Sequence, residues 1–149
     1  MTVMKCAKKA VLAGFLGLVA SVSSVVASAN TETIIVVNNR TSVQAAFGAG
    51  NFSGSVRPAL GYIDANTSTS FTLTSFGYQA SGIRFTYTAG TKKCRFTASH
   101  LALPSMRGHI PTWKKAGESI GSSRATCTAS ISLPTLGIPF NYTVNFTIQ

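Results

Sequence analysis

The side chains with the most chemical potential in this chain lie between Lys92 and Arg124, and most are cationic. This segment holds seven of the ten basic residues found after position 29, the single tryptophan and both histidines. An indole beside lysines suits a membrane interface, where the ring lies at headgroup depth and the ammonium groups meet anionic lipid. It equally suits a sugar or a base stacked on the ring. The candidate binding residues are Lys92, Lys93, Arg95, Arg107, His109, Trp113, Lys114, Lys115 and Arg124.

A structural interpretation of the same residues stays open. Trp113 could fill the core while Lys114 and Lys115 only face water. The charge excess could likewise serve solubility alone. Whether the indole is exposed beside the two lysines therefore decides between the two interpretations.

Catalysis has little support in the sequence. Acid–base chemistry needs a histidine or carboxylate with a placed partner, and no Gly-x-Ser-x-Gly nucleophile motif is present. The available groups after position 29 are Glu32, Asp64, Glu118, His100 and His109. We expect no catalytic residues and no cofactor, and a histidine in a loop is most often a solvated polar residue. An active site would require both histidines and an acid to converge in one pocket.

The cysteines predict one disulfide. Cys6 lies in a predicted targeting segment, which leaves Cys94 and Cys127. Two cysteines in an exported chain most simply form one bond. Two such ligands, with histidines that lack paired spacing, do not make a zinc site.

Residues 1–29 have the pattern of a cleaved, bacterial-type signal peptide. Three lysines precede a short apolar stretch, and Ala27-Ser28-Ala29 supplies the small residues at the cleavage site. A membrane anchor is the alternative, but the second half of the segment is rich in serine. We expect residues 30–149 to form one secreted or periplasmic domain.

The domain after position 29 is strongly basic. Ten lysines and arginines face three acids, which gives a net charge of +7. This excess favours anionic partners such as phospholipid, lipopolysaccharide or cell-wall polymers. Nucleic acid is a less expected partner, because the cations are not interleaved with outward aromatic residues.

Alternating apolar and polar residues predict the elements that position these groups. Ala89-Gly90 between two alternating runs predicts a hairpin, with Cys94 and Phe96 inward and Lys93 and Arg95 outward. The apolar run 32–38 predicts a strand buried on both faces, with residues 42–47 as a possible pairing partner. The other expected strands span residues 69–74, 82–88, 92–98, 124–133 and 140–148.

Two glycine- and proline-containing segments are predicted to be loops. These are residues 48–61 and 99–123, the second with at most a helical turn from Thr112 to Ser119. About six to eight short strands with turns between them predict an all-β, antiparallel β-sandwich. The basic segment would then be a long loop closed by the Cys94–Cys127 bond.

Two families share parts of this pattern. Five segments between Asn39 and Tyr87 resemble the first half of aegerolysin-like small β-sandwiches. This resemblance implies a lipid-binding sandwich. This chain departs from that family in being basic and in having one tryptophan, so no lipid-contacting residues carry over. The chain also resembles fimbrial subunits, in which residues 32–38 would be a donor strand, although pilin cysteines usually bridge earlier strands. The aegerolysin-like segments are Asn39-Arg40-Thr41, Gly50 to Pro58, Ile63, Phe71 and Gly82 to Tyr87.

The sequence thus predicts an exported, non-enzymatic protein that binds an anionic membrane or envelope surface through the loop at 92–124. The alternative is a structural, pilus-like subunit that assembles by strand exchange, for which an oligomer is expected.

Overall fold

The computed structural model describes residues 29–132 and 134–149. The regular secondary structure of these residues consists of β-strands. Most of the predicted signal peptide, residues 1–28, and Leu133, the last residue of the predicted strand 124–133, lie outside the described residues. Within the described ranges no helix is long and apolar enough to cross a membrane.

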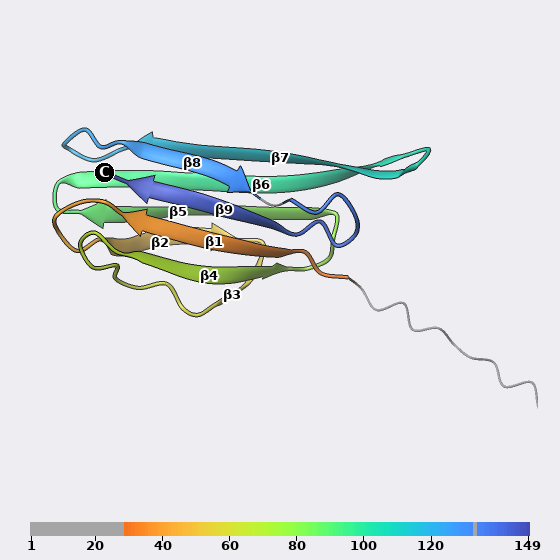
Figure 1. The fold of residues 1–149 in the computed structure, drawn as a ribbon, viewed down its shortest axis with the longest axis horizontal. Helices are drawn as coiled ribbons and strands as arrows, with labels where there is room; N and C mark the ends of the chain where they lie inside the picture. The colour runs from red at the N-terminus through yellow and green to blue at the C-terminus, as the bar shows by residue number, and fades with distance from the viewer. Residues whose placement is uncertain (1–28, 133) are drawn as a thin grey trace, which may run out of the picture.

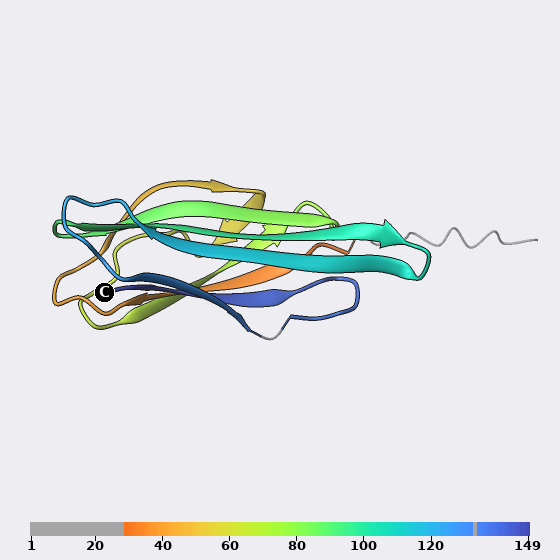
Figure 2. The same ribbon diagram turned by 90° about the horizontal axis from the view of Figure 1, so that it is seen from above.

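Nine strands in the described chain form two sheets. One sheet has the order β3-β4-β1-β9-β8 and the other the order β2-β5-β6-β7. The sheets lie face to face as two layers (Figures 1 and 2), which confirms the predicted all-β sandwich. One pair, β1 with β9, is parallel. The strands are β1 Glu32–Asn39, β2 Ala46–Phe52, β3 Gly54–Arg57, β4 Ser68–Ser75, β5 Ala80–Ala89, β6 Lys92–Ser105, β7 Gly108–Ser119, β8 Cys127–Ser132 and β9 Tyr142–Ile148.

The core is built by the inward positions of the alternating strands. Phe85 on β5 lies at its centre, with five aromatic rings at centroid distances of 5.3 to 6.2 Å. The predicted β5–β6 hairpin is confirmed: Ala89 pairs with Lys92, and Gly90 has a positive φ of 61°. Glycine adopts this conformation without steric cost.

Strand β1 differs from its prediction. It lies between β4 and β9, as a central strand should, but only one of its faces is buried. Ile35 and Val37 are inaccessible, whereas Ile34 is 47% exposed on the outer face. Residues 42–47 do not pair with β1, because β4 and β9 occupy both of its edges; β2 pairs with β5 in the other sheet.

The predicted loop at 48–61 was wrong in part, because it contains most of β2 and all of β3. Gly48 and Gly54 mark close approaches to neighbouring strands, whereas Gly61 has open space around it. A side chain at Gly54 would collide with the backbone of Thr74 on the neighbouring strand. Glycine in a strand often has this role.

The predicted loop at 99–123 was also wrong, and so was its helical turn. These residues form the second half of β6 and all of β7, a long hairpin whose tip is Met106-Arg107. The prolines are tolerated because each lies where a strand has a free edge. Pro111 is on the edge strand β7, and Pro104 lies beyond Leu101, the last β6 residue that pairs with β5.

The predicted disulfide is confirmed. Cys94 on β6 and Cys127 on β8 are bonded, with 5.7 Å between their Cα atoms. Because β6 and β8 belong to different sheets, the bond joins the two layers. Gly117 on β7 lies at the same place, and a Cβ there would come within 2.5 Å of the Cys127 carbonyl oxygen.

Candidate functional site

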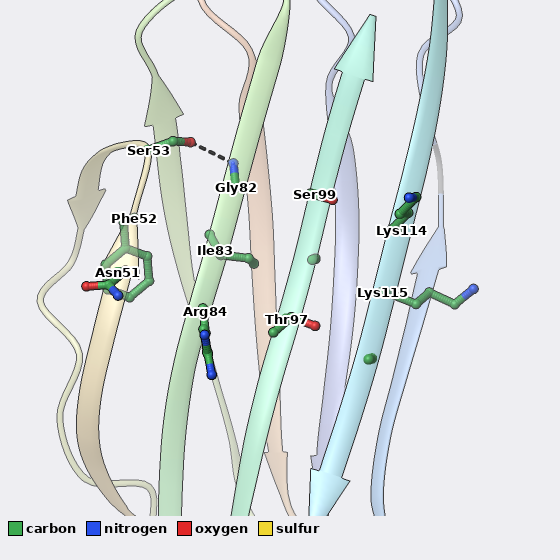
Figure 3. Close-up of a pocket in the computed structure, with 12 residues that line it drawn as sticks. Asn51, Phe52, Ser53, Gly82, Ile83, Arg84, Thr97, Ser99, Lys114 and Lys115 are labelled. Carbon is green, nitrogen blue, oxygen red and sulfur yellow. Dashed lines mark hydrogen bonds between the residues drawn. The ribbon is translucent and has the colours of Figure 1, made fainter.

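The candidate site is the outer face of the β2-β5-β6-β7 sheet, which we call the cationic face. Its outward residues are set by strand register: Arg84 pairs with Thr97, and Ser99 pairs with Lys114. Figure 3 shows these side chains around a shallow hollow of about 630 Å³. Arg84 on β5 and Lys114 on β7 both line it, one on each side of β6.

Arg95 lies on the same face but is partly neutralised. Its guanidinium donates to the Glu118 carboxylate, with 3.0 Å between the nitrogen and the oxygen. Both side chains are accessible, and such pairs contribute little to stability. Arg84 and Lys114 have no ion pair within the described residues, so their charges are available to a ligand.

Trp113 does not lie on the cationic face. It is opposite the buried His100 in the register, and it packs against the core from the inner side of β7. The two ring centroids are 5.9 Å apart. The indole therefore fills space between the sheets, as the structural interpretation of this residue expected, and it is not presented beside the lysines.

The remaining predicted residues are spread over the sandwich. Lys93 is outward on β6. Lys115 lies at the rim of the hollow and points toward β8 (Figure 3). Arg107 is at the hairpin tip and His109 is directed inward, with its ring 5.2 Å from that of Tyr78. Lys92 and Arg124 lie near the β5–β6 turn, where Lys92 bridges Ser123.

Arg84 was missing from the predicted site residues. It lies between the inward residues Ile83 and Phe85, and this alternation places it outward. The register of the β5–β6 hairpin then puts it beside Thr97. The alternation in the sequence indicates that Arg84 points outward. Its place beside Thr97 follows only once β5 and β6 are paired in the correct register.

The opposite outer face is chemically different. Its strands present hydroxyl and amide groups in rows, for example Ser68, Asn38 and Thr147 across β4, β1 and β9. Its outward charges on the described strands are Glu32 on β1 and Arg57 on β3. The sandwich therefore has one cationic face and one nearly neutral face.

The histidines do not form a catalytic arrangement in the described part of the chain. His100 was expected to be solvated, but it is only 1% exposed, because β6 continues through the position where a loop was predicted. Its ring lies among Trp113, Phe140 and Tyr142. Neither histidine donates to or accepts from an acidic side chain there, and those residues contain no cluster suited to a metal ion.

We expect the buried His100 to make the chain less stable as the pH falls below about 6.5, the ordinary histidine value. Burial disfavours the imidazolium and lowers the pKa of His100. The unfolded chain then binds this proton at a higher pH than the folded chain, so the free energy of unfolding falls until the folded pKa is passed. Urea unfolding between about pH 8 and pH 5 measures this.

The test variant is His100→Phe. It should flatten the pH dependence of unfolding in this window, since it removes the buried imidazole whose pKa is lowered. An unchanged slope in His100→Phe would show that other groups cause the acid sensitivity.

Comparison with protein-family models and with curated protein sequences found no match. The aegerolysin-like and fimbrial resemblances therefore stay predictions. The functional argument rests on the geometry of the two faces.

Proposed function

We propose that this protein is an exported, non-enzymatic binding protein that attaches to an anionic, phosphate-bearing envelope surface through its cationic face. Lipid, lipopolysaccharide and cell-wall polymers present this chemistry. The observation that carries the proposal is the separation of charge. The cationic face carries Arg84, Lys93, Arg95 and Lys114 with one acid, Glu118, whereas the other outer face carries Glu32 and Arg57 on the described strands.

The arrangement of the cations supports recognition of a surface more than of an enclosed ligand. The hollow between Arg84 and Lys114 is open and shallow (Figure 3), and Thr97 and Ser99 add hydroxyl groups to its floor. A flat sheet face with two free cations can meet several anionic groups together. Each cation held near an anionic membrane contributes about 1 kcal/mol, and this contribution weakens with salt.

The test is vesicle sedimentation with phosphatidylglycerol-containing and with neutral vesicles, at low and raised salt. We expect wild type to bind the anionic vesicles at low salt and to dissociate as salt rises. The double variant Arg84→Glu/Lys114→Glu reverses two charges on the face. Its affinity at low salt should fall roughly 700-fold, since roughly 4 kcal/mol of favourable interaction is removed.

The matched control is Arg40→Glu/Arg57→Glu, which changes the net charge equally at exposed sites away from the cationic face. Its affinity should fall by less than about tenfold, through the long-range field alone. Equal losses in both double variants would show that only net charge matters. No binding of wild type to anionic vesicles would remove lipid from the possible surfaces.

The alternative function, strand exchange, would require β1 to enter a neighbouring chain. In this structure β1 is a central strand of its own sheet, hydrogen-bonded to β4 on one side and to β9 on the other. Its removal would open the sheet between β4 and β9. Size-exclusion chromatography of the exported chain distinguishes this function, because a subunit that exchanges strands should form polymers.

A further inference from the structure

The exposed apolar side chains of this protein gather at one end of the sandwich, which we call the apolar end. Three segments meet there: the β4–β5 connection at 76–79, the β6–β7 tip and the β8–β9 connection at 134–141. Ten large apolar side chains are exposed among the described residues, and seven of them belong to these segments and the adjoining strands. They are Phe76, Leu101, Leu103, Met106, Ile110, Leu136 and Ile138.

The three segments are packed against one another. The Tyr78 ring lies 5.2 Å from the His109 ring of the hairpin and 6.5 Å from the Phe140 ring of the β8–β9 connection. These contacts use the inner side of the hairpin. These inner contacts hold the three segments together, and the exposed apolar side chains point away from them into solvent.

The β6–β7 hairpin extends past the other strands at this end (Figures 1 and 2). Pairing of β6 with β5 stops at Leu101, so the pairs from Leu103–Ile110 to the tip have no third strand beside them. Leu103 and Ile110 face outward and are more than half exposed, and Met106 at the turn is fully exposed. A soluble chain rarely leaves such a patch uncovered without a binding role.

The apolar patch is continuous with the cationic face. Lys114 projects on the same side of β7 as Ile110, four residues away, which is about 13 Å at strand spacing. Arg107 stands at the tip itself, and its long side chain can keep the guanidinium in a polar layer while its carbon atoms contact apolar groups. The exposed apolar groups thus lie at the end of the sandwich, with Arg107 beside them at the tip and Lys114 further along β7.

We propose that the apolar end enters the boundary between headgroups and acyl chains of an anionic lipid bilayer, while the cationic face meets the headgroups. This inference rests on the proposed function and selects lipid as the surface. Hydrated cell-wall polymers offer no apolar interior for Leu103, Met106 and Ile110. A second copy of the chain would bring a like-charged cationic face against the first, which disfavours that pairing.

The position of Glu32 sets the tilt of the bound protein. Glu32 lies at the same end but on the outer face of the other sheet, at the start of β1. A carboxylate would be repelled by anionic headgroups. The bound sandwich should therefore lean toward the β6–β7 side, which brings Lys114 and Arg84 to the surface and keeps Glu32 in water.

The experiment compares two double variants in sedimentation with phosphatidylglycerol-containing vesicles at low and raised salt. Leu103→Thr/Ile110→Thr removes apolar groups from the patch and places threonine, a residue that favours strands, at both positions. Ile34→Thr/Val43→Thr makes the same kind of change at exposed sites outside the patch. Ile34 is on the other outer face, and Val43 is in the β1–β2 connection. The patch variant should lose about tenfold or more in affinity at raised salt, where apolar contact remains, and the control should bind as wild type does.

Insertion is measured separately with Met106→Trp and Val43→Trp and vesicles that carry brominated acyl chains. The indole at position 106 should be quenched on binding. The indole at position 43, near the opposite end of the sandwich, should not be quenched. Trp113 is partly buried in every variant and provides a constant background.

The outcomes separate the two proposals. Salt-sensitive binding of wild type without quenching at position 106, and without loss in the patch variant, would overturn insertion and leave the cationic face as the binding site. No binding of wild type to anionic vesicles would overturn insertion and leave only non-lipid anionic surfaces for the cationic face. A dimer of wild type that becomes a monomer in the patch variant would overturn the lipid assignment in favour of a second copy.

Discussion

Replacement of both Cys94 and Cys127 by alanine is expected to lower the free energy of unfolding by about 3–4 kcal/mol. The bond closes a loop with a sequence separation of 33 residues, and the chain-entropy model gives this magnitude for such a loop. The loss is large because small domains have margins of about 5–15 kcal/mol. The bond also joins β6 to β8 across the two layers, so the unlinked sheets should separate more readily.

Urea unfolding of the double variant and of oxidised and reduced wild type measures this effect. Reduced wild type should have about the same midpoint as the double variant, since both lack the cross-link. Replacing both cysteines avoids leaving a free thiol that could react. A loss below about 1 kcal/mol would show that packing of the two inner faces, and not the bond, holds the layers together.

The strands that sequence patterns predicted are those with apolar inner and polar outer positions. The run from Tyr142 to Ile148 alternates cleanly, and it is strand β9 as expected. The second half of β6 was missed because its outward positions Leu101 and Leu103 are apolar, so the alternation disappears. The outward apolar groups that hid the strand are the ones that we assign to membrane contact, which fits the expectation that local rules fail at functional sites.

The candidate site could be predicted in composition but not in arrangement. Lys114 and Lys115 are adjacent in sequence, and a loop would have allowed both to reach one ligand beside Trp113. A strand sends neighbouring side chains to opposite faces, so Lys114 lies on the outer face and Trp113 faces the core. Lys115 points toward β8 at the rim of the hollow (Figure 3). Arg84 joins Lys114 only through the pairing of β5 with β6 and of β6 with β7. No local pattern shows such a pairing.

The same substitution at two phenylalanines should separate folding from binding. Phe85 is 1% exposed and surrounded by five aromatic rings, whereas Phe76 is 89% exposed at the apolar end. Phe85→Ala should cost about 3–5 kcal/mol of unfolding free energy, because it removes the central core ring and leaves a cavity. Phe76→Ala should leave the unfolding midpoint within about 0.5 kcal/mol of wild type.

Vesicle binding should respond in the reverse order. Phe85→Ala that remains folded keeps both the cationic face and the apolar end, so its affinity for anionic vesicles should match wild type. Phe76→Ala loses an exposed ring that would otherwise enter the bilayer boundary, and its affinity at raised salt should fall about tenfold. Equal affinities for the two variants would mean that the β4–β5 connection stays in water. The contact would then belong to the β6–β7 hairpin and the β8–β9 connection, with the sandwich tilted further toward β7.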